Sequence, residues 1–154
     1  MTTWRPPAGI RAIVIGLAWD NGRLLASEIR GSDGVVKGIR PLGGSIEFGE
    51  TREQALHREF KEELGIAISI VGPWHAIENI FEFEGRTGHE IVFAADVELN
   101  DNSLFGREEI YTIESGQEQR VVWADLSELA VRDLKLFPIG LAQIIQLHQV
   151  SQNS

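Results

Sequence analysis

Three glutamates recur at helical spacing near the middle of the chain, at Glu59, Glu62 and Glu63. At ~100° of rotation per residue, their side chains fall within an arc of roughly 100° on one helix face. Like charges at this spacing destabilise a helix by roughly 0.2–0.5 kcal/mol per pair, and a bound cation would reverse the sign of that contribution. Carboxylate oxygens are hard ligands of the kind that Mg²⁺ or Mn²⁺ prefers. The spacing therefore indicates a divalent cation site, although a Glu-rich helix is more often only a solvated face.

A glycine-containing loop, Gly43 to Gly49, comes directly before this helix. The free N–H groups and the dipole at a helix start help to hold an anion. A metal beside a phosphate group is the arrangement of a site that hydrolyses phosphoric anhydrides. The loop and the acidic face together favour that chemistry.

The helix itself has clear boundaries in the sequence. Thr51 and Gln54 match a capping box, and Gly65 stands where a glycine commonly ends a helix. Leu56 and Phe60 belong to an apolar stripe beside the acidic face. We expect a helix between Thr51 and Gly65 that packs on this stripe and presents its carboxylates beside it.

The remaining elements are expected to be strands, apart from a C-terminal helix. The helix is predicted from the apolar spacing of Leu141, Ile144, Ile145 and His148. Alternating and β-branched patterns predict strands at 10–19, 23–29, 38–41, 66–71, 74–84, 89–99 and 119–123. Strands mixed with a few helices predict an α/β sandwich with a central mixed sheet.

Length and composition indicate one folded domain over residues 1–154. The chain has 154 residues, of which 43% are hydrophobic and 24% charged. The absence of cysteine excludes disulfides, zinc–thiolate sites and a thiol nucleophile. The longest apolar run, Ile13 to Trp19, is too short to span a bilayer, and the first residues lack the order of a secretory signal. We expect a soluble cytoplasmic protein with no membrane partner.

The net charge of −9 comes from 14 Lys and Arg against 23 Asp and Glu. Such a surface repels nucleic acid backbones at long range, so no nucleic-acid partner is expected. The same imbalance suits a protein that binds divalent cations.

The segment from Gly43 to Ile66 resembles the signature of the Nudix hydrolase family. The matching positions are Gly44, Glu50, Arg58, Glu59, Phe60, Glu62, Glu63, Gly65 and Ile66. Two departures are Phe60, where the family usually has an aliphatic residue, and Leu42, which separates Pro41 from the two glycines. The resemblance implies a Nudix-type α/β/α sandwich.

The resemblance also implies roles for the signature residues. Glu62 and Glu63 would coordinate the metal, with the Gly44 carbonyl as a further ligand. Glu59 matches a residue that binds metal in some members and acts as a base in others. Arg58 would orient a signature glutamate through a charged hydrogen bond.

A further carboxylate is expected from outside the helix, because family members usually supply one from the loop before the last strand. That loop offers Glu108, Glu109, Glu114 and Glu118. We favour Glu118 as catalytic residue and metal ligand, because it begins the strand that leads to Trp123.

Substrate-binding residues lie outside the signature. Arg40 and Arg30 end strands near the glycine loop and are candidates for phosphate contacts, and Phe83 is a candidate for stacking on a base. The proline typical of ADP-ribose members is replaced here by Phe81 and Glu82. The tyrosine of dinucleoside polyphosphate members is likewise absent from positions 82–84.

The implied activity is that of a Mg²⁺- or Mn²⁺-dependent pyrophosphohydrolase, in which activated water attacks phosphorus in a nucleoside diphosphate derivative. A small nucleotide is expected, with ADP-ribose slightly favoured. Three alternatives remain open at this point: an RNA 5′-end pyrophosphohydrolase, a nucleotide-sensing module without catalysis, and an acidic structural protein. A homodimer is also left open.

Overall fold

The computed structural model describes residues 6–114 and 116–152. Two α-helices, α1 (Arg52–Leu64) and α2 (Leu141–Gln152), and a short 3₁₀ helix, η1 (Leu126–Glu128), accompany eleven strands in this part of the chain. The strands are β1 (Ile10–Leu17), β2 (Trp19–Asp20), β3 (Arg23–Arg30), β4 (Val36–Pro41), β5 (Gly43–Ser45), β6 (Ile68–Ile70), β7 (His75–Phe83), β8 (Arg86–Leu99), β9 (Ile110–Glu114), β10 (Gln117–Ala124) and β11 (Lys135–Leu136). No helix among these residues is long and apolar enough to cross a membrane.

The strands form two sheets. The first sheet has the order β5-β1-β8-β6, with β7 also paired to β8, and the second has the order β11-β4-β3-β10-β9, with β2 paired to β3. Each sheet contains one parallel pair, β1 with β8 and β11 with β4, among antiparallel neighbours. The predicted α/β class with mixed strands is confirmed, and the strands are divided between two sheets. Only Leu42 separates β4 from β5, so the chain passes there from the second sheet to the first.

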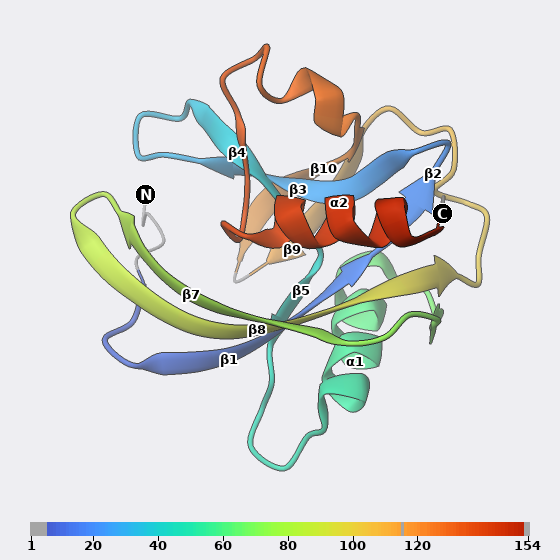
Figure 1. The fold of residues 1–154 in the computed structure, drawn as a ribbon, viewed down its shortest axis with the longest axis horizontal. Coiled ribbons are helices and arrows are strands. Elements are labelled where there is room, and N and C mark those ends of the chain that lie inside the picture. The colour runs from blue at the N-terminus through green and yellow to red at the C-terminus, as the bar shows by residue number, and fades with distance from the viewer. Residues whose placement is uncertain (1–5, 115, 153–154) are drawn as a thin grey trace.

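The two long helices lie on opposite sides of the first sheet (Figure 1). Val14 of β1 belongs to the buried cluster that contains Leu56 and Phe60 of α1. Its neighbour Ile13 belongs to the cluster that contains Leu141 of α2. Because successive strand residues point to opposite faces, α1 and α2 lie on the two sides of β1. This is the α/β/α layering that the sequence predicts.

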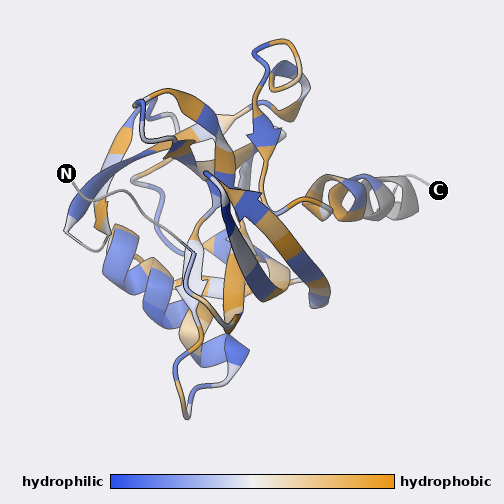
Figure 2. Cartoon of the chain, turned by 90° about the vertical axis from the view of Figure 1, so that its left-hand side faces the viewer, coloured by the Kyte–Doolittle hydropathy of each residue, from blue (hydrophilic) through white to orange (hydrophobic). Residues whose placement is uncertain are grey.

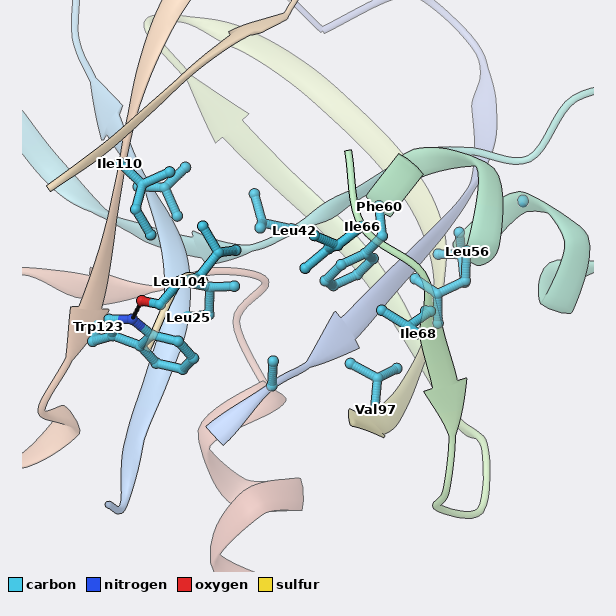
Figure 3. Close-up of a cluster of buried hydrophobic side chains, with 14 residues drawn as sticks. Leu25, Leu42, Leu56, Phe60, Ile66, Ile68, Val97, Leu104, Ile110 and Trp123 are labelled. Atoms are coloured by element: carbon cyan, nitrogen blue, oxygen red, sulfur yellow. Dashed lines mark hydrogen bonds between the residues drawn. The ribbon is translucent and has the colours of Figure 1, made fainter. Parts of the chain in front are cut away.

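Helix α1 begins and ends where the sequence predicts. The Thr51 side chain accepts a hydrogen bond from the Gln54 N–H, and the Gln54 side chain accepts one from the Thr51 N–H. Gly65 ends the helix in the left-handed conformation, with φ of 70°. At Gly16 a Cβ would lie 2.7 Å from the Phe60 ring, so this glycine lets α1 pack directly on β1. Figure 3 shows Phe60 and Leu56 in the resulting apolar cluster, and Figure 2 shows that most residues of the same helix are hydrophilic.

Several strands differ from the sequence-based expectation. The region before residue 119 was expected to be a loop, but it contains β9, which pairs with β10. Strand β8 begins at Arg86, because Phe81 lies opposite Gly88 and the turn is confined to Glu84 and Gly85. The short strands β2, β5 and β11 were not predicted as separate strands, since two or three residues carry no readable alternation. Of the predicted C-terminal helix positions, the side chain of His148 lies outside the described residues.

Candidate active site

A polar cavity of about 330 Å³ opens where α1 meets the edge strand β5. The side of the cavity formed by α1 carries Glu59, Glu62 and Glu63, which are the three carboxylates predicted to share one helix face. The complete lining is Arg11, Arg40, Gly44, Ser45, Glu47, Arg58, Glu59, Glu62, Glu63 and Ile113. Segments from both sheets and from α1 therefore meet at one site.

Arg58 joins the helix to the preceding loop through five hydrogen bonds. Its Nε donates to Glu50 Oε2 at 2.7 Å and its Nη2 donates to Glu50 Oε1 at 2.8 Å, which makes a bidentate pair. Nη1 donates to Glu59 Oε1 at 2.9 Å and to Glu62 Oε2 at 3.3 Å. Nη2 also donates to the carbonyl of Ser45 at 3.0 Å. These bonds hold the loop, the edge strand and the acidic helix face in a fixed relation.

The carboxylates of the site differ in proton affinity. Hydrogen bonds from Arg58, together with one from the Glu47 N–H, lower the pKa of Glu50 to about 2 from an ordinary value of 4.5. The same contacts raise the pKa of Arg58 well above its ordinary value. Burial raises the pKa of Glu59, an effect that Arg58 opposes. Glu50 is therefore an ionised partner of Arg58 at neutral pH, whereas Glu59 binds a proton more readily than an ordinary glutamate.

Two glycines of β5 bring the backbone close to other groups. A Cβ at Gly44 would collide with the Glu59 carboxyl group, and a Cβ at Gly43 would collide with the Val14 carbonyl. Gly44 therefore leaves space for a functional side chain, whereas Gly43 leaves space for the neighbouring strand β1. Only the first of these contacts concerns the chemistry of the site.

The chemistry of the donors fits a hard divalent cation. Glu59, Glu62 and Glu63 supply only oxygen atoms, which Mg²⁺ and Mn²⁺ prefer. Within residues 6–114 and 116–152, no three acidic or histidine side chains converge tightly enough to enclose an ion. The Nη1 atom of Arg58 contacts both Glu59 and Glu62, so its positive charge reduces the repulsion between them.

The NUDIX domain family model matches residues 9–147, which is nearly the whole chain. The chain belongs to the Nudix family.

The chain is similar in sequence to several proteins with named activities. The nucleoside triphosphatase NudI of Enterobacter sp. (strain 638) is 43% identical over 67 residues, which are 42% of this chain and 48% of that protein. The oxidized purine nucleoside triphosphate hydrolase of Danio rerio is 36% identical over 108 residues, covering 65% of this chain and 60% of that protein. NudI of Salmonella paratyphi B is 29% identical over 143 residues, covering 82% and 89%. The first match thus spans about half the length of its relative.

Solved structures support the Nudix fold. A NUDIX hydrolase from Nitrosomonas europaea superposes with a TM-score of 0.64 at 18% identity, covering 93% of this chain and 90% of that one. A putative nudix hydrolase family member from Chromobacterium violaceum superposes with a TM-score of 0.52 at 20% identity, covering 97% and 84%.

The Nudix cavity includes some of the substrate-binding candidates from the sequence and leaves out others. Arg40 lines the cavity, as do all the signature carboxylates on the predicted helix face. Arg30 does not, because its guanidinium group donates to Glu28 and to the carbonyl of Gly34. Phe83 lies opposite Arg86 at the end of β7 and is also absent from the lining.

Glu118 lies beside the Nudix cavity without lining it. It pairs with Ile113, which does line the cavity, so the two residues share one side of the second sheet. The side chain of its competitor Glu114 lies outside the described residues. The position of Glu118 keeps it as a candidate for the additional carboxylate.

Sequence analysis did not single out Arg11, which lines the Nudix cavity from β1. The sequence does contain a sign of its role: Arg11 is a charged residue on the same strand face as the buried Ile13 and Ile15. That pattern could have identified Arg11 as a residue directed toward a polar site.

Proposed function

We propose that this chain is a Mg²⁺- or Mn²⁺-dependent hydrolase of small nucleoside triphosphates. The observation that carries the proposal is the joint presence of Glu59, Glu62 and Glu63 with Arg11 and Arg40 around one cavity. Carboxylates that bind a cation and arginines that bind phosphate are the two components needed to hold a nucleotide polyphosphate. The triphosphatase names of the relatives favour triphosphates over ADP-ribose.

The signature residues have different roles in the proposed reaction. Glu62 and Glu63 would hold the cation, and Glu59 and the Gly44 carbonyl are further oxygen donors for it. A cation held there supplies Lewis acidity and activates water as a nucleophile. Glu59 accepts the proton of the attacking water, a role that suits a carboxylate whose pKa is raised by burial. The water oxygen bonds to phosphorus as the bridging P–O bond breaks, and the other phosphate part of the nucleotide leaves with the bridging oxygen and its electron pair.

The arginine side chains of the site bind and orient the substrate. Arg40 contacts phosphate oxygens, whereas Arg58 is already occupied by Glu50, Glu59 and Glu62 and positions them. The cavity is lined by both signs of charge, so a short polyphosphate with its cation fits. A long anionic polymer would in addition meet the negative surface within a Debye length of about 8 Å.

A substrate panel tests the proposal. The chain is assayed with Mg²⁺ and with Mn²⁺ against ribo- and deoxyribonucleoside triphosphates, ADP-ribose, a nucleotide sugar and 5′-triphosphate RNA, and kcat/KM and the products are recorded. A nucleoside triphosphate is expected to give the highest kcat/KM. The proposal is wrong if no nucleotide is hydrolysed with either metal, or if the RNA exceeds every small nucleotide by about tenfold or more.

Replacement of a metal-binding carboxylate tests the site. Glu63→Gln keeps the shape of the side chain and removes its charge, so turnover should fall by about 100-fold or more while the fold is retained. Glu53→Gln, an exposed position in the first turn of the same helix, is the matched control and should leave turnover unchanged. Near-normal turnover of Glu63→Gln at saturating Mg²⁺ would show that Glu63 is not a metal ligand.

A further inference from the structure

Glu90 is a buried carboxylate with an incomplete set of hydrogen bonds. Its side chain is 7% exposed, and its Oε2 atom is buried without a hydrogen-bond partner. Among the described residues it is the only buried side-chain oxygen or nitrogen in this state. Buried carboxylate oxygens normally accept hydrogen bonds, because the loss of water is otherwise uncompensated. The exception therefore needs a physical explanation.

A second buried glutamate shows what full pairing looks like in this protein. Glu28 is 5% exposed, and it accepts hydrogen bonds from Arg30 at 3.1 Å and from Arg120 at 2.6 Å. Both of its carboxylate oxygens are satisfied, as expected for a buried structural ion pair. Glu28 and Arg120 lie away from the Nudix cavity. Glu28 and Glu90 are thus buried to a similar extent, but only Glu90 has a carboxylate oxygen without a hydrogen bond.

The group nearest to Glu90 is a residue of the Nudix cavity. Arg11 of β1 stands opposite Glu90 of β8, and its Nη1 lies 3.7 Å from Glu90 Oε2. This distance allows electrostatic attraction but exceeds hydrogen-bond range. The other terminal nitrogen of Arg11, Nη2, donates to the hydroxyl of Ser45 in β5. Arg11 is thus held between a buried carboxylate and the edge strand of the site.

Arg11 also has donors to spare, unlike the signature arginine. Every nitrogen of the Arg58 guanidinium already donates to a carboxylate. Arg11 is 30% exposed and lines the cavity, and within the described part of the chain its guanidinium group makes one hydrogen bond, to Ser45. A guanidinium group carries five N–H donors, so Arg11 can bind an anionic oxygen in the cavity and keep its present contacts.

We propose that Arg11 is a substrate-binding residue that donates to a phosphate oxygen of the nucleotide, and that the buried Glu90 carboxylate is its positioning residue. The proposal rests on the function proposed above and adds to it how Arg11 is held in place to contact the polyphosphate together with Arg40. Glu90 keeps the Arg11 guanidinium at the cavity wall, where its attraction opposes movement of the arginine into solvent. A phosphate contact is favoured over a base contact because Arg11 shares the cavity with the three carboxylates expected to hold the cation.

Four variants and a base-free ligand test the proposal. Arg11→Ala, Glu90→Gln, the double variant and Glu28→Gln are compared in steady-state hydrolysis of the best triphosphate, in binding of inorganic triphosphate with Mg²⁺, and in thermal unfolding. Inorganic triphosphate has no base or sugar, so its binding reports phosphate contacts even if turnover is low. Glu28→Gln is the control for the loss of a buried charge.

The expected result is a change in KM with little change in kcat. Arg11→Ala should raise KM and weaken inorganic triphosphate binding by about tenfold or more, and Glu90→Gln should do the same to a smaller extent. The double variant should bind inorganic triphosphate no more weakly than Arg11→Ala does, because Glu90 acts through Arg11. Glu28→Gln should change unfolding alone.

Three outcomes would overturn the proposal. Unchanged binding of inorganic triphosphate in Arg11→Ala would show that Arg11 does not contact the phosphate. Additive losses of binding in the double variant would show that Glu90 does not act through Arg11. A Glu90→Gln variant that changes only its unfolding temperature, as Glu28→Gln is expected to do, would make Glu90 merely structural. Failure of the proposed function is a separate result, because it would appear as a wild-type chain that hydrolyses no nucleotide with either metal.

Discussion

Arg58 illustrates how one residue links several parts of the site. It binds Glu50 bidentately and donates to Glu59 and Glu62, so one guanidinium group holds three carboxylates in place. Lysine could not replace it, since an ammonium group lacks the planar fork that makes the bidentate pair. The pKa of Glu50 falls to about 2 as a consequence. This shift has a measurable effect on stability.

At the residue scale we predict that Glu50 makes stability sensitive to acid. Its pKa is lower in the folded chain than the ordinary value of 4.5, so its contribution is complete above about pH 4.5 and is lost as pH falls toward 2. Urea unfolding of wild type and Glu50→Gln should therefore differ most at pH 7, and the difference should shrink between pH 4.5 and 2. A difference that stays constant across this window would contradict the pairing with Arg58.

At the scale of elements, the short strand β5 connects the two sheets and brings α1 to the cavity. Its consecutive glycines face different neighbours, because strand residues alternate between the two faces. A Cβ at Gly44 would meet the flexible end of Glu59, whereas a Cβ at Gly43 would meet the backbone of β1. We therefore expect a side chain at position 44 to affect activity and one at position 43 to affect stability.

Alanine at each glycine should separate these two effects. Gly44→Ala should displace the Glu59 carboxyl group and lower turnover by about tenfold or more, with little loss of stability, since small misplacements of catalytic groups are costly. Gly43→Ala should lower the free energy of unfolding by about 2–3 kcal/mol through overpacking against β1. Steady-state kinetics and urea unfolding of both variants test this contrast, and equal effects of the two variants on stability would refute it.

At the scale of the whole molecule, the cavity depends on both sheets. Arg11, Gly44 and Ser45 come from the first sheet, whereas Arg40 and Ile113 come from the second. Strand β9 had been expected to be irregular, yet it places Ile113 at the cavity and Glu118 opposite it on β10. The second sheet thus pairs Glu118 with a residue that lines the cavity.

We predict that Glu118 supplies this additional carboxylate. Glu118→Ala should lower turnover much more than Glu114→Ala, because phosphoryl transfer with more than one cation needs ligands beyond one helix face. Turnover at saturating Mg²⁺ and the Mg²⁺ concentration that gives half of it are measured for both variants. The reverse order of effects would assign the role to Glu114.

The sequence alone determined the acidic helix and its loop, because their signals are local. The capping box of Thr51 and Gln54, the terminal Gly65 and the i, i+3, i+4 spacing of the glutamates all act within a few turns of one helix. The tertiary structure decided which distant residues complete the cavity. Arg11, Glu90 and Ser45 meet only through the register of β1 with β8 and β5. Residue alternation along a strand shows which face a side chain occupies, but strand partners and register depend on the packing of the entire core.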